Sequence, residues 1–207
     1  LLYFINILEA IFNDMITIIS ATNRKDSLTV KVAGFYSELL SQQNVDNQVM
    51  DLCDLPNDFM FSNFYGSSTE PFVEMVDKYI NKAEKFVVIS PEYHGSYPGI
   101  FKAFIDCLGS DGIASKKVAL VGVATGKAGN LRGLEHLTSL FHHLKAEVFS
   151  SKPKLSEVHK LLGENGKIEK KLSLLKNLSP KKVMVLKYDL LIPRIYQSLQ
   201  LELQCLL

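Results

Sequence analysis

The sequence is poor in cysteine and has almost no net charge. Its three cysteines, Cys53, Cys107 and Cys205, are far apart and form no Cys-x-x-Cys pair, which argues against a disulfide framework or a zinc ribbon. The net charge of +1 provides no long-range field that would recruit nucleic acid or an anionic membrane. We therefore expect a protein of the reducing cytoplasm, with neither nucleic acid nor a membrane as its partner.

Long hydrophobic runs are also missing. No apolar stretch reaches the roughly 18 to 20 residues that cross a bilayer. Residues 1–14 contain no basic residue and no cleavage site of small residues, so they predict neither a signal peptide nor an anchor. We expect an N-terminal extension at residues 1–14, a single domain at residues 15–182, and a tail or helix at residues 183–207.

The apolar residues that are present recur in short runs typical of buried strands. The strongest runs are rich in β-branched residues and lie at residues 15–21, 86–90 and 117–123. Weaker strands are expected at residues 47–52 and 147–150.

Segments with helical periodicity separate these strands. They lie at residues 29–40 and 72–83 and after Leu131, and Thr69 is expected to cap the second of them, with Pro71 in its first turn. Buried strands that alternate with amphipathic helices predict an α/β fold, with a five-stranded parallel sheet covered on both faces. The flavodoxin-like order 2-1-3-4-5 and the Rossmann order both satisfy this pattern, and in both the ligand binds beyond the carboxyl ends of the strands.

The loop after the first predicted strand is rich in hydroxyl groups and has no glycine. A dinucleotide fingerprint and a P-loop both need glycines, so neither is present. The loop suits a terminal phosphate monoester instead, because it combines the Arg24 guanidinium with the free N–H groups of the first turn of the helix that follows. Leu28, near the end of the loop, is a further candidate for cofactor binding. The hydroxyl donors are those of Ser20, Thr22, Ser27 and Thr29. The alternative is that Ser27 only caps the helix and that the rest is an ordinary loop.

The loop after the third predicted strand carries a second motif. Together with the first loop it resembles the NADPH-dependent FMN reductase family, whose marks are a P-E-Y-x-x-S/G-x-P-G/A segment and an L-K-x-x-x-D helix. The matching positions of this segment and helix are Pro91, Glu92, Tyr93, Ser96, Pro98, Lys102 and Asp106. The family's phosphate loop, roughly G-S/T-x-R-x-x-S, matches at Ser20, Thr22, Arg24 and Ser27.

This resemblance implies a flavodoxin-like three-layer sandwich that holds FMN. NADPH or NADH would reduce the flavin, and a small-molecule acceptor such as a quinone, an azo compound, free flavin or a metal ion would then take the electrons. The family is commonly dimeric or tetrameric, so a homodimer or homotetramer is implied. The catalytic chemistry would be that of the flavin N5, with no catalytic side chain and no metal.

In the second motif, backbone groups from Glu92 to Ser96 suit the pyrimidine edge of the isoalloxazine ring, with Tyr93 as an aromatic wall and Gly95 keeping the edge rigid. His94 stands where the family often has Asn, and it is a candidate for tuning substrate preference. The alternative is an ordinary strand-to-helix connection with packing aromatics. Lys102 and Asp106, spaced i and i+4, are expected to form a helix ion pair.

The loop after the fourth predicted strand lies near the isoalloxazine in the family. Thr125, Gly126 and Gly129 are therefore the candidates that the resemblance carries over. Lys127 and Arg132 are candidates for the extra phosphate of NADPH, or else ordinary solvated cations.

Other kinds of site find no support. The sequence has no G-x-S-x-G elbow, and His136 and His143 lie two helical turns apart, too far to bind one metal ion. Two further readings of the same fold stay open: a flavodoxin-type electron carrier, although such carriers are usually strongly acidic, and a non-catalytic scaffold.

Overall fold

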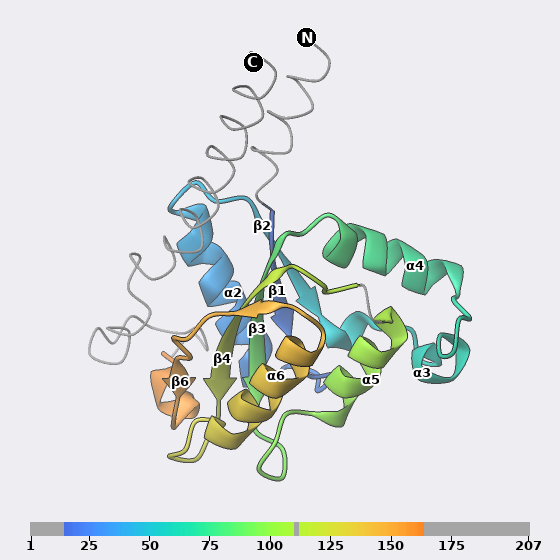
Figure 1. Ribbon diagram of the computed structural model, residues 1–207. Coiled ribbons are helices and arrows are strands. Elements are labelled where there is room, and N and C mark those ends of the chain that lie inside the picture. The colour runs from blue at the N-terminus through green and yellow to red at the C-terminus, as the bar shows by residue number, and fades with distance from the viewer. Residues whose placement is uncertain (1–14, 110–111, 164–207) are drawn as a thin grey trace, which may run out of the picture.

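The computed structural model describes residues 15–109 and 112–163 (Figure 1). The predicted extension at residues 1–14 and the tail at residues 183–207 lie outside the described residues, as does the end of the predicted domain beyond residue 163. No helix in the described part is long and apolar enough to cross a membrane.

A parallel sheet forms the centre of the molecule (Figure 1). Its strands run in the order β2-β1-β3-β4-β5, which confirms the predicted flavodoxin-like order. The strands are β1 (Ile16–Ser20), β2 (Asn47–Asp51), β3 (Lys85–Pro91), β4 (Lys117–Val123), β5 (Glu147–Val148) and β6 (Lys154–Leu155). The chain passes from β1 to β2 on one side and to β3 on the other, so the topological switch point lies between β1 and β3.

The far edge of the sheet differs from the prediction of one strand at residues 147–150. β5 ends at Val148, and the sixth strand, β6, pairs with the carboxyl end of β4. Pro153 lies in the break between them; it cannot donate a hydrogen bond, but its carbonyl accepts one from the Gly122 N–H at 2.9 Å. The fifth position of the sheet is thus filled by two short strands with a bend between them.

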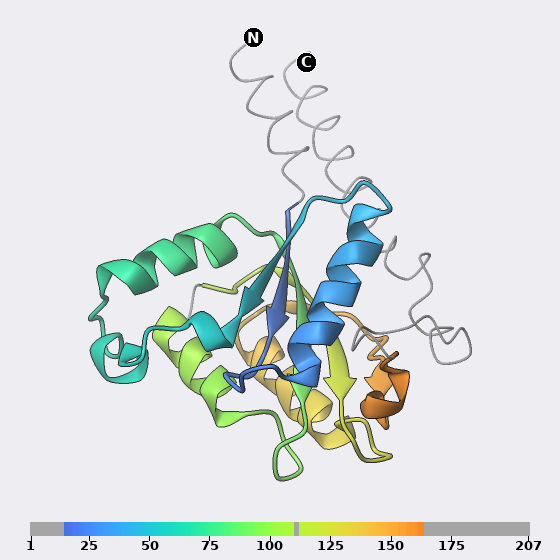
Figure 2. The ribbon, with the colours of Figure 1, turned by 180° about the vertical axis from the view of Figure 1, so that it is seen from behind.

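Helices cover both faces of the sheet. α2 (Leu28–Ser41) and the short helix η3 (Val158–Leu161) lie on one face (Figure 2). α4 (Glu70–Val76), α5 (Gly99–Leu108) and α6 (Leu131–His143) lie on the other. Shorter helices, η1 (Leu52–Asp54) and α3 (Phe59–Ser62), connect β2 to α4, and η2 (Asp77–Asn81) continues α4 as a π-helical turn.

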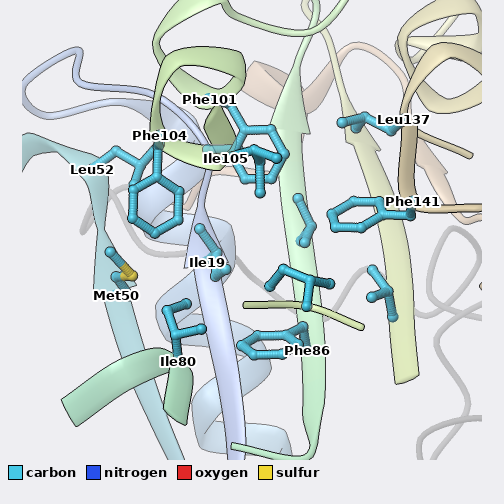
Figure 3. Packing of buried hydrophobic residues seen from close by; sticks show 14 of the residues in the cluster. Ile19, Met50, Leu52, Ile80, Phe86, Phe101, Phe104, Ile105, Leu137 and Phe141 are labelled. Carbon is cyan, nitrogen blue, oxygen red and sulfur yellow. The ribbon is translucent and has the colours of Figure 1, made fainter. Parts of the chain in front are cut away.

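The two apolar faces of the sheet have separate cores. Phe101, Phe104 and Phe141 from α5 and α6 pack against Phe86 and neighbouring strand residues on one face (Figure 3). Each such ring stabilises the fold by roughly 1.5–3 kcal/mol relative to an exposed one. The sheet and its helices therefore form a rigid platform for the loops at its carboxyl edge.

The start of α4 also differs in detail from the prediction. Thr69 is the N-terminal flanking residue and Pro71 lies in the first turn, as expected, but the Thr69 hydroxyl does not cap the helix. It donates instead to Asn63 Oδ1 at 3.1 Å, which also accepts the Thr69 N–H at 2.6 Å.

Candidate functional site

The carboxyl ends of β1, β3 and β4 lie at one edge of the sheet. Ser20 at the end of β1 is level with Ile89 in β3, and Pro91 at the end of β3 is level with Val123 at the end of β4. The three loops that follow these strands therefore begin side by side, although they are far apart in the sequence.

The loop after β1 leads directly into α2. Ser27 is the N-cap, and its Oγ accepts the Val30 N–H at 3.1 Å, which confirms its capping role. This acceptor role leaves the hydroxyl hydrogen of Ser27 able to donate elsewhere. The remaining N–H groups of the first turn of α2 have no partner within the helix, so the end of the helix suits an anion.

The loop after β3 is a tight two-residue turn. Tyr93 and Ser96 exchange two backbone hydrogen bonds, of 2.8 and 3.0 Å, and His94 and Gly95 between them have φ values of 52° and 76°. Two successive positive φ values are the mark of a type I′ turn. The Glu92, Tyr93 and Ser96 N–H groups are bonded within the protein, whereas the His94 and Gly95 N–H groups at the tip form no hydrogen bond among the described residues.

A side-chain hydrogen bond joins the two loops. The buried Thr22 Oγ1 lies 3.0 Å from the Tyr93 hydroxyl, and it also accepts the Arg24 N–H at 3.3 Å. The two motifs, which are 71 residues apart in the sequence, are thus in direct contact.

A cavity of about 260 Å³ lies between these loops. Its lining comes from the loop after β1, the end of β3, the end of β4 and η3. The lining residues are Arg24, Asp26, Ser27, Leu28, Thr29, Pro91, Glu92, Tyr93, Val123, Thr125 and Val158. The cavity is slightly smaller than typical small-molecule sites, which are about 300–1,000 Å³, so a larger ligand would extend out of it.

The charged side chains that line the cavity differ in whether they have partners within the protein. Within the described residues, the Arg24 guanidinium forms no ion pair, which leaves all its donors for a ligand. Glu92 is engaged, because its carboxylate accepts the Asn130 N–H at 3.1 Å. Asp26 lines the cavity from a backbone position with φ of 52°, and its carboxylate opposes an anion bound there.

A second acidic group lies close behind the phosphate-type loop. Asp51, at the end of β2, is level with Ser20, and its carboxylate accepts the Cys53 N–H at 3.3 Å. Burial raises the pKa of the Asp51 carboxyl above its ordinary value, although this hydrogen bond opposes the rise. Burial therefore disfavours the charged form of the Asp51 carboxyl relative to the same group in water.

The loop after β4 is tightly packed at Gly129, against the strand residue Gly122, whereas residues 125–128 are exposed. A Cβ on Gly122 would lie 2.1 Å from the Gly129 carbonyl oxygen, and one on Gly129 (φ of 59°) would lie 2.8 Å from the Lys154 Cβ. Both glycines thus allow close packing of the backbone. Of the three candidates in this loop, Thr125 alone lines the cavity, while the Gly126 carbonyl accepts the Glu157 N–H at 3.1 Å.

The structure therefore separates the predicted site residues into two groups. Those that line the cavity are Arg24, Ser27, Leu28, Thr29, Pro91, Glu92, Tyr93 and Thr125. Those that do not are Ser20, Thr22, His94, Gly95, Ser96, Gly126 and Gly129. The Ser20 side chain is fully buried in the sheet.

Sequence reasoning missed several residues at the site. Val123 and Val158 line the cavity as apolar walls; Val123 ends a predicted strand, whereas no sequence signal brings Val158 here. His136 of α6 also lies at the site, since its Nδ1 is 2.8 Å from the Ser96 Oγ. The described residues hold no cluster of three metal-ligating side chains.

Comparison with known proteins agrees with this geometry. The sequence profile of the NADPH-dependent FMN reductase family matches residues 15–160, a range that contains all three loops. The chain belongs to this family.

A curated relative matches part of the chain in sequence. The FMN-dependent NADPH-azoreductase of Staphylococcus aureus is 32% identical over 112 residues, which are 53% of this chain and 60% of the relative. The chain thus spans about 60% of the length of the curated relatives that it matches.

Solved structures with the same fold include an NADH:FMN oxidoreductase (EMOB) in its apo form. Its TM-score is 0.64 at 20% identity, and the match covers 81% of this chain and 87% of that one. The NAD(P)H:acceptor oxidoreductase FerB of Paracoccus denitrificans has a TM-score of 0.63 at 21% identity, with coverage of 82% and 94%.

Two details of this FMN reductase family member now have physical explanations. His94, in the place of the family's frequent Asn, has φ of 52°, and Asn and His are both among the residues that tolerate positive φ. Lys102 and Asp106 form the predicted ion pair, at 2.5 Å. Both side chains are well exposed, so the pair contributes little to stability.

Proposed function

We propose that this chain is an FMN-dependent oxidoreductase that takes electrons from NADPH or NADH and passes them to a small-molecule acceptor. The observation that carries the proposal is the contact between the two loops. A donor set for a phosphate monoester and Tyr93, the first residue of the turn, line the same cavity, and the Thr22 Oγ1 lies 3.0 Å from the Tyr93 hydroxyl.

The donor set fits the phosphate of FMN. Hydrogen-bond donors of three kinds come from residues that line the cavity: the Arg24 guanidinium, the Ser27 and Thr29 hydroxyl groups, and the first-turn N–H groups of α2. FMN, which has a single phosphate and no pyrophosphate, matches this set better than a dinucleotide does. The loop has no glycine that would allow the backbone to approach a pyrophosphate closely. Asp26 is the feature that opposes an anion here.

The ring would lie outside the cavity, on the turn. The volume of about 260 Å³ suits the phosphate and the sugar-like chain, and the His94 and Gly95 N–H groups are free to meet the pyrimidine edge. Tyr93 would stay fixed by Thr22 as one wall. Of the candidate residues, Ser20, Thr22, Ser96, Gly126 and Gly129 would shape the site without lining it.

Bound FMN would supply the redox chemistry, because its N5 accepts and releases a hydride. The residues of the chain would bind and orient it, and N–H donors near the pyrimidine edge would stabilise negative charge there. An acceptor such as a quinone, an azo compound, free flavin or a metal ion suits this role. By the resemblance we also propose a cytoplasmic homodimer or homotetramer, which light scattering on the purified chain would test.

The decisive experiment is to purify the chain, identify any flavin released on denaturation, and follow NADPH and NADH oxidation with a quinone and with an azo dye. Steady oxidation by a yellow protein that releases FMN would support the proposal. A flavin-loaded protein that turns over neither nicotinamide cofactor would indicate an electron carrier. A colourless protein that does not bind added FMN would overturn the proposal and leave a scaffold of the same fold.

A further inference from the structure

Asn130 holds the end of β3 from the far side of the site. Its side chain is fully buried, and its Nδ2 donates to the Ser90 carbonyl at 3.0 Å, the Ser90 Oγ at 3.2 Å and the Pro91 carbonyl at 3.0 Å. Its backbone N–H donates to the Glu92 carboxylate at 3.1 Å. One residue thus contacts three consecutive residues, directly before the turn at Tyr93–Ser96.

The turn is attached to α6 at both ends. Asn130 is the residue before the first turn of α6 and holds the start of the turn. His136, in the second turn of α6, is bonded through Nδ1 to Ser96 Oγ at its end. α6 therefore helps to set the position of the turn, together with the Glu92 N–H bond to the Val123 carbonyl of β4, and Asn130 makes the more buried of the two attachments to α6.

The conformation of Asn130 shows that its side chain is retained at a cost. Its φ of 64° is a left-handed conformation, which glycine adopts more easily. Its Oδ1 is buried without a hydrogen-bond partner, and such an atom is costly to bury. A glycine would avoid both costs, but it would release Ser90 and Pro91.

Gly133 leaves the space that Asn130 needs. A Cβ on Gly133 would lie 2.0 Å from the Asn130 Oδ1 and 2.8 Å from its Cγ. Glycine in the middle of α6 otherwise weakens the helix relative to alanine. The two residues therefore form a matched pair in which the missing side chain of one admits the amide of the other.

We propose that Asn130 is a positioning residue, for which Gly133 leaves the space. It holds the Tyr93–Ser96 turn in the position, relative to the cavity, in which the turn receives the flavin ring. The proposal rests on the proposed FMN function. Asn130 acts on the ring side of the site, because its side-chain amide and its N–H donate to Ser90, Pro91 and Glu92, and no hydrogen bond joins it to the described loop from Thr22 to Thr29.

The test compares FMN with riboflavin, which lacks the phosphate. In Asn130→Gly the backbone keeps its left-handed conformation and the N–H to Glu92, while the three amide contacts are lost. We expect both flavins to bind more weakly by the same factor, on the order of tenfold, the worth of one well-aligned hydrogen bond. The ratio of the two affinities stays that of the parent.

Gly133→Ala displaces the Asn130 side chain without changing the residue itself, because the added Cβ would lie 2.0 Å from the Asn130 Oδ1. Alanine in a helix interior is ordinarily stabilising, so a loss of affinity for both flavins in this variant points to displacement of Asn130. Asn63→Ala is the matched control, since Asn63 is also buried and donates to the Phe59 carbonyl at 2.8 Å in α3. That variant is expected to lose stability and keep both affinities.

Each outcome decides the question. If Asn130→Gly is less stable but binds both flavins like the parent, Asn130 is only structural and the proposal fails. A loss confined to FMN would place its effect on the phosphate side and would also overturn it. If the parent binds neither flavin, the proposed function fails, and hydrogen exchange decides the positioning claim: faster exchange of the Tyr93 and Ser96 amides in Asn130→Gly supports it, and unchanged exchange refutes it.

Discussion

The loop after β1 and the turn after β3 meet at the same cavity, but they are held in different ways. The loop carries exposed charged side chains, Arg24 and Asp26, and is fixed mainly by the Ser27 cap and by Thr22. The turn is fixed by its own backbone and by contacts from two other elements, β4 and α6. This contrast suggests that the first region selects a ligand by charge and that the second selects it by shape.

The largest effect is expected where the packing behind the turn is tightest. Gly122→Ala would place a Cβ 2.1 Å from the Gly129 carbonyl oxygen, and such overpacking against backbone costs about 3 kcal/mol or more. Urea denaturation measures this loss. The matched control is Gly34→Ala in α2, where a Cβ meets nothing within 4 Å; it should stabilise the fold by about 0.5–1 kcal/mol. Equal changes in stability for Gly122→Ala and Gly34→Ala would show that the packing behind the turn is no tighter than that around α2.

Next in size is the effect of Arg24 on cofactor binding. Arg24→Ala should weaken FMN affinity by about 1.5–3 kcal/mol, the worth of a hydrogen bond to a charged group, while riboflavin affinity scarcely changes. Fluorescence titration with each flavin measures both values, and Lys25→Ala controls for the loss of a neighbouring charge. A parallel loss of riboflavin affinity would mean that Arg24 does not act through a phosphate.

The hydrogen bond that joins the two regions should be worth less. Thr22→Val and Tyr93→Phe each remove one partner of the 3.0 Å contact, and in a double-mutant cycle we expect a coupling free energy of about 1 kcal/mol. Denaturation of the two single variants and the double variant gives this value. Strictly additive losses would show that the loops are positioned independently of each other.

A smaller effect of opposite sign is expected at Asp26. Asp26→Asn keeps a residue that tolerates the φ of 52° and removes the negative charge from the cavity lining. FMN affinity should rise by about 0.5–1 kcal/mol, and the gain should shrink as salt is added. Riboflavin affinity should stay constant. A fall in FMN affinity would mean that the carboxylate takes part in binding.

The smallest effect concerns Asp51 behind the loop. Burial raises the pKa of its carboxyl in the folded state, so the folded protein holds this proton more tightly than the unfolded chain and loses stability as the pH rises through that pKa. Asp51→Asn should therefore match the parent in acid, below the ordinary Asp pKa of about 3.9. At neutral pH it should be more stable by less than about 0.5 kcal/mol. Denaturation at several pH values tests this, and a difference that is largest in acid would contradict it.

The main strands could be predicted from local patterns, and so could three of the polar residues that line the cavity, whereas the predicted donors Ser20 and Thr22 do not line it. Residues 118–123 are apolar without a break, and Arg24, Ser27 and Thr29 lie in the segment that follows the first strand. The split edge of the sheet could not, because β6 depends on the pairing of Lys154 and Leu155 with the distant β4. Asn130 has no local signal either: its role comes from contacts with Ser90 and Pro91, about 40 residues away.

Titration of the purified, flavin-free chain with FMN and with riboflavin tests most directly whether the end of α2 holds a phosphate monoester. With Arg24 unpaired among the described residues and several further donors in the cavity lining, FMN should bind at least about tenfold more tightly than riboflavin. Equal affinities for the two flavins would contradict the assignment of this loop.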